Sequence, residues 1–184
     1  SPMCVRSKPG VPRARGVAPD AVTTPLAADA LVVLVGPSGS GKSTWATDRF
    51  APSEIVSADA FRELVAGDAA DQSATADAFK VLHSVAKARL RRGLRTVVDA
   101  TNLTERARRQ LLRLAESAGR PVVAVAFDVS LERCLAQNAA RPDRCVPEAV
   151  VRRHYREMVG ALRRLPQEGY AAIHLVTEAE IGSG

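Results

Sequence analysis

One segment of the sequence has the residue types needed to hold a chain of phosphates. It fits the pattern G-x-x-x-x-G-K-[ST] and runs Gly36, Pro37, Ser38, Gly39, Ser40, Gly41, Lys42 and Ser43, with Thr44 directly after it. Glycines let the backbone bend until successive N–H groups face phosphate oxygens, and the N-terminus of a following helix adds partial positive charge. We expect Lys42 to reach the β- and γ-phosphates of ATP and the Ser43 hydroxyl to bind Mg²⁺.

The residues around this segment favour a P-loop over a glycine-rich turn with an exposed lysine. Residues 31–35 (LVVLV) form a continuous apolar run, typical of a central parallel strand, and lead directly into the glycines. The chain has no Asn-Lys-x-Asp guanine reader, no Asp-x-x-Gly switch and no Leu-Ser-Gly-Gly transporter signature, and it is too short for the full core of an AAA-type motor. A small kinase is the class that remains.

Two charged residues, one helical turn apart, follow a second predicted strand at 54–57. Asp59 and Arg62 can face one cleft from this position. A carboxylate beside the γ-phosphate could orient an acceptor hydroxyl and take its proton. Alternatively, Asp59 caps the helix that follows. The residues alone leave both roles open.

A third predicted strand, at 95–99, ends on an acidic residue. Asp99 stands where a Walker-B carboxylate would hold Mg²⁺ directly or through water. Thr101, Asn102 and Thr104 come next, and any of them could cap the following helix. For Thr104 we favour this structural role.

Two arginines lie between helices predicted at 131–140 and 146–165. A helix–loop–helix flap of this kind can close over a nucleotide, and the guanidinium groups of Arg141 and Arg144 would meet phosphate oxygens in a planar fork. Solvated surface arginines fit the pattern equally well. We expect a helical lid around residues 131–165, with the role of its arginines open.

The whole pattern alternates strands and helices. Further strands are predicted at 122–127 and 171–176, and further helices at 76–92 and 104–118. This predicts an α/β fold: an open parallel β-sheet of about five strands flanked by helices, of the P-loop kinase type, with ligands at the carboxyl ends of the strands. The kinase domain is expected at 30–184. Residues 1–29 read as a flexible basic arm, either a solvated tail or a nucleic-acid-binding segment, and Ser1 and Pro2 have the form of a scar left by tag removal.

Composition limits the class of protein further. The chain has 184 residues, of which 46% are hydrophobic, enough for one core and too few for two ordinary domains. No apolar run approaches the roughly 20 residues of a membrane-spanning helix, and no signal peptide is evident, so we expect a soluble cytoplasmic protein without a membrane partner. The net charge of +6 favours polyanionic partners, although a P-loop also needs positive potential.

Other polar residues carry weaker signals. The arginine-rich stretches at 87–92 and 106–109 could form a basic track, but such runs are usually the solvated face of a helix. His83, His154 and His174 are scattered without metal-ligand spacing, so the sequence assigns them no role.

Taken in order, these motifs resemble the 5′-hydroxyl polynucleotide kinase module of bacterial RNA end-healing polynucleotide kinase-phosphatases. The resemblance runs from residue 31 to residue 176 and rests on the P-loop, on SADAFR at 57–62, on TVVDATN at 96–102 and on RPDR at 141–144. It implies that Asp59 is the general base, that Arg62 contacts the acceptor end, and that Arg141 and Arg144 are lid arginines. Gln137 departs from the pattern, because a further lid arginine is expected there.

The resemblance also implies a function and partners. The expected reaction is ATP- and Mg²⁺-dependent phosphorylation of 5′-OH ends of RNA or DNA in nucleic-acid repair, with phosphatase and ligase-like modules in a longer parent protein. A P-loop kinase for an antibiotic, sugar or nucleotide shares the first motif and remains an alternative. A nucleotide-binding regulatory module without transfer activity is a second.

Overall fold

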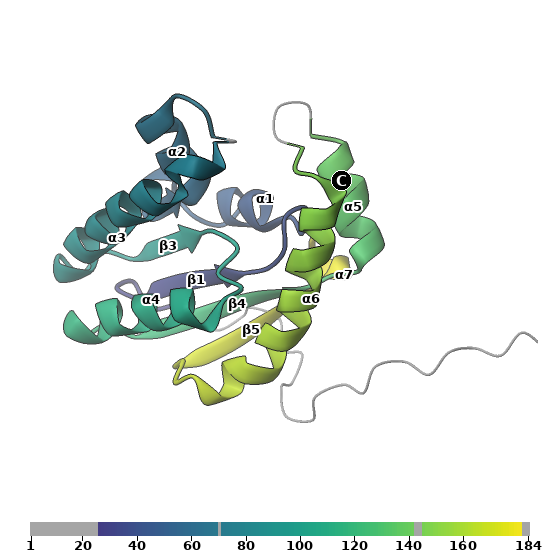
Figure 1. Ribbon diagram of the computed structural model, residues 1–184. Coiled ribbons are helices and arrows are strands. Elements are labelled where there is room, and N and C mark those ends of the chain that lie inside the picture. The colour runs from purple at the N-terminus through teal and green to yellow at the C-terminus, as the bar shows by residue number, and fades with distance from the viewer. Residues whose placement is uncertain (1–25, 70, 142–144, 182–184) are drawn as a thin grey trace, which may run out of the picture.

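The computed structural model describes residues 26–69, 71–141 and 145–181, and a parallel five-stranded sheet lies at its centre (Figure 1). The strand order is β2-β3-β1-β4-β5. The strands are β1 (Leu31–Val35), β2 (Ile55–Ser57), β3 (Thr96–Asp99), β4 (Val122–Asp128) and β5 (Ala172–Thr177). The expected open parallel sheet of the P-loop kinase type is confirmed.

Helices follow every strand and account for the connections between parallel neighbours. They are α1 (Lys42–Thr47), α2 (Ala58–Ala66), α3 (Thr75–Arg91), α4 (Glu105–Ser117), α5 (Leu131–Ala139), α6 (Glu148–Arg164) and α7 (Glu178–Ile181), with short 3₁₀ helices at Pro52–Glu54, Gln72–Ala74 and Leu165–Gln167. The predicted helices lie within about two residues of these bounds. The terminal α7 was not expected.

The central strand is buried on both of its faces, as its continuous apolar run predicts. Leu31, Val33 and Val35 pack in a core with α3, α4 and α6, through residues such as Leu82, Leu111 and Met158. On the opposite face, Val32 and Leu34 pack with Trp45 and Phe50. The sheet is therefore covered on both sides, and polar groups gather at its carboxyl edge.

Strand order and register bring three distant motifs to that edge. Ser57 on β2 lies beside Asp99 on β3. The backbone N–H of Gly36, where β1 ends, donates to the Thr101 carbonyl at 3.0 Å, which joins the P-loop to the loop after β3. Figure 1 shows α2 on one side of α1 and the α5–α6 pair on the other. This arrangement places the predicted lid across the P-loop from α2.

The boundary of the N-terminal arm is a correction to the sequence analysis. Residues 1–25 lie outside the described part of the chain, but residues 26–29 are held by the fold. Arg95 donates from Nη1 to the Leu26 carbonyl at 3.2 Å and from its backbone N–H to the Ala28 carbonyl at 2.9 Å. Asp29 pairs with Arg120 at 2.7 Å. These four residues belong to the domain.

None of the helices in the described segments is both long and apolar enough to span a membrane.

Candidate functional site

The P-loop connects β1 to α1 and is seated tightly against the lid. Gly39 and Gly41 have φ values of 81° and 87°, in the left-handed region that favours glycine. A Cβ on Gly39 would lie 2.2 Å from the Cys134 carbonyl oxygen of α5, and one on Gly41 would lie 3.0 Å from a methyl group of Ile181. Gly39 therefore requires glycine both for its backbone conformation and for space, and Gly41 requires it for its backbone conformation.

The Lys42 side chain is folded into the P-loop. Its ammonium donates to the Pro37 carbonyl at 2.7 Å and to Ser40 Oγ at 3.3 Å, and the residue is only 8% exposed. Burial lowers the pKa of Lys42 to about 8, the Asp99 carboxylate opposes this shift, and the Arg141 guanidinium adds to it. An anion bound in the loop would favour the charged ammonium. The site thus holds a partly desolvated cation that a phosphate group would stabilise.

Asp59 and Arg62 come together as an ion pair at the start of α2. Arg62 also donates from Nε to the Ala69 carbonyl at 2.8 Å, so its guanidinium has a fixed position. The Asp59 side chain is 32% exposed, against 13% for Arg62, which leaves the carboxylate within reach of a ligand. The structure brings both residues to the edge where the P-loop emerges.

The capping role considered for Asp59 is wrong. The N-cap of α2 is Ser57, whose Oγ accepts the Ala60 N–H at 3.4 Å, and Asp59 lies within the first helical turn. A carboxylate there still interacts favourably with the helix dipole. The cap and the candidate base are therefore two different residues, which can be tested separately.

Asp99 is buried at the end of β3 and close enough to Lys42 for its charge to affect the pKa of that lysine. Ser43 is in the first turn of α1, directly after Lys42. A hydroxyl and a carboxylate are the oxygen donors that Mg²⁺ prefers, and the remaining ligands of such an ion are usually phosphates and waters. Over the described residues, no cluster of three or more His, Cys, Asp or Glu side chains could hold a metal alone. This donor set fits a Mg²⁺ ion that arrives with a nucleotide.

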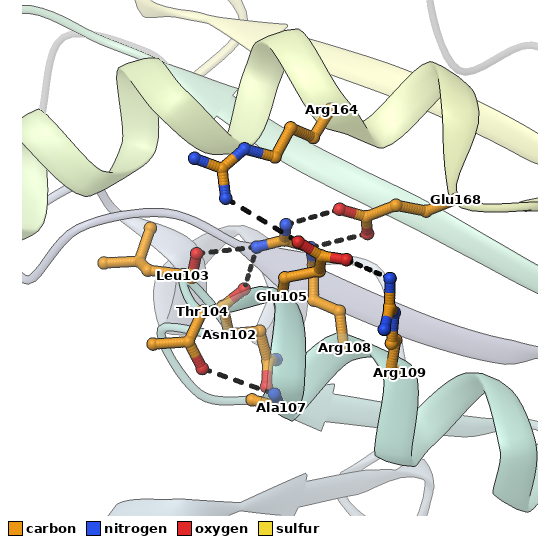
Figure 2. A network of polar contacts seen from close by, with 9 residues as sticks. All are labelled: Asn102, Leu103, Thr104, Glu105, Ala107, Arg108, Arg109, Arg164 and Glu168. Atoms are coloured by element: carbon orange, nitrogen blue, oxygen red, sulfur yellow. Dashed lines mark hydrogen bonds and ion pairs between the residues drawn. The ribbon is translucent and has the colours of Figure 1, made fainter.

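The loop between β3 and α4 is fixed by buried polar contacts (Figure 2). Asn102 has φ 48° and donates from Nδ2 to the Leu34 carbonyl at 2.8 Å, which ties the loop to the central strand. Arg108 donates from Nη1 to the carbonyls of Asn102 and Leu103 at 3.0 and 2.7 Å. Thr104 caps α4 by accepting the Ala107 N–H at 3.3 Å, as predicted. The carboxyl end of β3 is therefore rigidly supported.

Arg108 itself is a correction to the sequence analysis. The sequence of residues 106–109 predicts a basic track or a solvated helix face, but Arg108 is fully buried and forms a bidentate ion pair with Glu168. Its neighbours Arg106 and Arg109 remain exposed. The stretch therefore combines exposed arginines with one buried arginine, Arg108, that has a structural role.

The lid arginines are only partly placed. Arg141 follows α5, and its charge is near enough to lower the pKa of Lys42, an effect smaller than burial and than the opposing effect of Asp99. Arg144 lies outside the described residues. The Gln137 amide, oriented to satisfy both of its ends, donates to the Gly39 carbonyl at 2.9 Å and accepts from Arg133 Nη2 at 3.2 Å. Gln137 thus supports the P-loop at the position where a further arginine was expected.

Two contacts to the P-loop were missed by the sequence analysis. His154 Nδ1 lies 3.1 Å from Ser38 Oγ. Its position on α6 offered a signal, because the buried residues Val151 and Met158 are three positions before it and four after it. Ile181 of α7 lies over Gly41, and the chain before it gives no pattern that would reveal this contact.

The family of the chain follows from a match that covers most of this site. Residues 31–165 match the model of a family described as AAA domain. The chain belongs to this family. From the sequence we expected a small kinase and set aside a full AAA-type motor core because of the chain length. No curated protein matches this AAA domain chain.

Solved structures show which fold this AAA domain has. The Pnkp1/Rnl/Hen1 RNA repair complex aligns with a TM-score of 0.64 and 21% identity, over 79% of this chain and 49% of that one. A putative kinase from Chloroflexus aurantiacus aligns with a TM-score of 0.58 and 19% identity, over 84% and 91%. Kti12 from Chaetomium thermophilum in complex with ADP-AlF3 aligns with a TM-score of 0.58 and 19% identity, over 82% and 93%. The fold is that of P-loop kinases, and the chain spans about half the length of the first of these structures.

Proposed function

We propose that this chain is a kinase that transfers the γ-phosphate of ATP to the 5′-hydroxyl end of RNA or DNA. The observation that carries the proposal is the Asp59–Arg62 ion pair at the start of α2, which follows β2 at the same carboxyl edge of the sheet from which the P-loop emerges. A P-loop alone accounts for nucleotide binding. A partly exposed carboxylate held by an arginine at the same edge adds a group that can receive the proton of an acceptor hydroxyl.

The residues of the site divide the reaction between them. The P-loop amides and Lys42 would hold the β- and γ-phosphates, while Ser43 and Asp99 would hold Mg²⁺, which neutralises charge on the phosphates. Asp59 would accept the hydroxyl proton as the acceptor oxygen bonds to the γ-phosphorus. The bond from that phosphorus to the β–γ bridging oxygen breaks, and ADP leaves.

Arginines would stabilise the reacting groups from two sides. Arg62 would hold the Asp59 carboxylate in place and contact the acceptor end. Arg141 and Arg144 would neutralise charge on the transferring phosphoryl group, and the effect of Arg141 on Lys42 supports its presence near the phosphates. Because a guanidinium stays charged in proteins, it suits this task at any physiological pH.

The acceptor class is supported by the motif order and by one structural neighbour. That neighbour is a component of an RNA repair complex, Pnkp1/Rnl/Hen1. A net charge of +6 is consistent with a polyanionic acceptor. We therefore propose that phosphatase and ligase-like partners act with this chain on the same nucleic-acid ends.

The deciding experiment offers one enzyme several acceptors. The chain is mixed with γ-labelled ATP, Mg²⁺ and 5′-OH oligonucleotides of RNA or DNA, with matched 5′-phosphorylated oligonucleotides as controls and a panel of hydroxylated metabolites in parallel. Label on the 5′-OH oligonucleotides alone is the expected result. Label on a metabolite would indicate a small-molecule kinase, and ATP binding without transfer would indicate a regulatory module.

Salt dependence provides a second readout of the same proposal. Binding of a polynucleotide releases condensed counterions, so the apparent affinity for the oligonucleotide should fall steeply as salt rises. The affinity for ATP should change less. An affinity for the oligonucleotide that does not change between low and physiological salt would contradict the proposal that the acceptor is a polynucleotide.

A further inference from the structure

A histidine of the lid touches the P-loop. His154 lies on α6, and its Nδ1 is 3.1 Å from Ser38 Oγ, although the two residues are 116 positions apart in the chain. Both side chains are half-buried. On either side of His154 along α6, the buried residues Val151 and Met158 anchor the helix in the protein. The imidazole is thus held at the P-loop by the packing of a whole helix.

Burial, together with nearby positive charges, determines the protonation state of the imidazole. Burial lowers the pKa of His154 to about 4, and the positive charges of Arg153 and Lys42 add to this effect. The ring is therefore neutral at physiological pH. A neutral imidazole has one N–H donor and one acceptor nitrogen, so it can direct a hydrogen bond without adding charge.

The Ser38 hydroxyl can serve either as donor or as acceptor in this contact. If Ser38 donates to Nδ1, its hydroxyl proton is engaged by His154 and cannot donate to a ligand. If Nδ1–H donates to Ser38 Oγ instead, the serine proton is free to point toward an anionic ligand in the P-loop. A bound phosphate presents only acceptors, so it selects the second arrangement.

We propose that His154 is a positioning residue of the phosphate site, which donates from Nδ1–H to Ser38 Oγ and so orients the Ser38 hydroxyl proton toward a nucleotide phosphate. The inference rests on the nucleotide-binding part of the proposed function and not on the identity of the acceptor. It also links the lid to the P-loop, because α6 carries the imidazole and the loop carries its partner.

A double-mutant cycle tests the pair directly. Mg-ATP affinity is measured by calorimetry for wild type, Ser38→Ala, His154→Phe and the double variant. A net hydrogen bond corresponds to roughly a tenfold change in affinity, so each single variant should bind ATP about tenfold more weakly. The double variant should be no weaker than Ser38→Ala, because the imidazole acts only through that hydroxyl.

Two conservative variants test the geometry. The amide nitrogen of asparagine can occupy the place of Nδ1, whereas that of glutamine reaches the place of Nε2. His154→Asn should therefore keep ATP affinity within about twofold of wild type, and His154→Gln should bind as weakly as His154→Phe. His83→Phe, which changes a half-buried histidine of α3, is the matched control and should leave ATP affinity unchanged.

The outcomes separate this inference from the proposed function. Additive losses for Ser38→Ala and His154→Phe, or equal losses in the Asn and Gln variants, would overturn the positioning role and leave His154 as a packing residue. Wild type that binds ATP but phosphorylates no acceptor would overturn the proposed kinase activity alone. Wild type that binds no ATP would overturn both.

Discussion

Arg108 and Glu168 form a buried bidentate ion pair that joins α4 to the turn before β5 (Figure 2). Nη2 and Nε of the arginine lie 2.6 and 2.8 Å from the two carboxylate oxygens. The Arg108 side chain is fully buried and that of Glu168 is 7% exposed. The remaining nitrogen of Arg108, Nη1, donates to the carbonyls of Asn102 and Leu103 in the loop that follows Asp99. The pair therefore connects the turn before the outermost strand β5 to the candidate site.

Breaking this pair should destabilise the protein strongly. Glu168→Ala leaves a buried guanidinium without its counter-ion, and we expect a loss of about 3–5 kcal/mol in the free energy of unfolding. Urea denaturation measures the loss. Arg108→Met with Glu168→Met should cost less than Glu168→Ala, because no buried charge is left unpaired.

Arg109 supplies the control on the same helix. Its ion pair with Glu105 is exposed, so Arg109→Met should change the free energy of unfolding by less than about 1 kcal/mol. Similar losses for Glu168→Ala and Arg109→Met would show that the buried position of the Arg108–Glu168 pair has no energetic consequence.

Substitution of Asp59 should affect phosphate transfer, whereas substitution of Ser57 should mainly affect stability. Asp59→Asn keeps the size of the side chain but removes the charge and the proton acceptor, so transfer should fall by roughly a hundredfold or more. Ser57→Ala removes the cap of α2 and should cost about 1 kcal/mol of stability with a smaller effect on transfer.

Thermal melting with and without Mg-ATP measures folding and nucleotide binding in both variants and so serves as their control. Nucleotide stabilisation should persist in Asp59→Asn, because the P-loop is unchanged. An Asp59→Asn enzyme that transfers phosphate at the wild-type rate would remove Asp59 from the catalytic residues and weaken the polynucleotide kinase proposal.

Patterns within short stretches of sequence were sufficient to predict the fold. The apolar run of β1, the glycines of the P-loop and the spacing in α3 each reflect local geometry, so their elements were found within a few residues. The strand order then placed Asp99 beside Ser57, as parallel strands with a common carboxyl edge require.

Contacts between distant residues could not be predicted in the same way. Arg108 looks like its exposed neighbours in sequence, because the partner that permits its burial, Glu168, is 60 positions away. His154 and Ser38 are farther apart still. No periodicity encodes such pairs, since each depends on how helices pack on the finished sheet. The alternative of a capping role for Asp59 was wrong for a local reason, because Ser57, two residues earlier, is also a good N-cap and takes that position.

Arg141, the one of the two predicted phosphate-binding lid arginines that the structure describes, should affect the rate of phosphate transfer more than the stability of the protein. Arg141→Ala removes a charge that acts near Lys42, and losing such a contact to a transferring phosphoryl group raises the barrier by on the order of 2–4 kcal/mol. Arg141→Lys should recover only part of the rate, because an ammonium lacks the planar fork. Single-turnover kinetics at saturating ATP measure both. Wild-type rates in Arg141→Ala would identify an ordinary surface arginine.

Lys42 should make the stability of the nucleotide-free protein depend on pH in a defined direction. Its pKa is about 8 in the folded protein and about 10.5 in the unfolded chain, because burial disfavours the ammonium. Between these two values the unfolded chain binds more protons, so the free energy of unfolding should rise with pH in that window. Below about pH 8 both states are protonated, and the full cost of burying the charge remains.

A comparison with Lys42→Met isolates this effect from the other groups that titrate at alkaline pH. The stability of wild type relative to Lys42→Met should increase by about 2–3 kcal/mol between about pH 7 and about pH 10, as measured by urea denaturation without nucleotide. The methionine variant should also bind Mg-ATP far more weakly at either pH, because it lacks the cation that meets the phosphates. With saturating Mg-ATP, the increase for wild type should shrink, because bound phosphates raise the pKa of the ammonium again. A stability difference that stays constant over this pH range would show that the Lys42 ammonium is not desolvated in the empty P-loop.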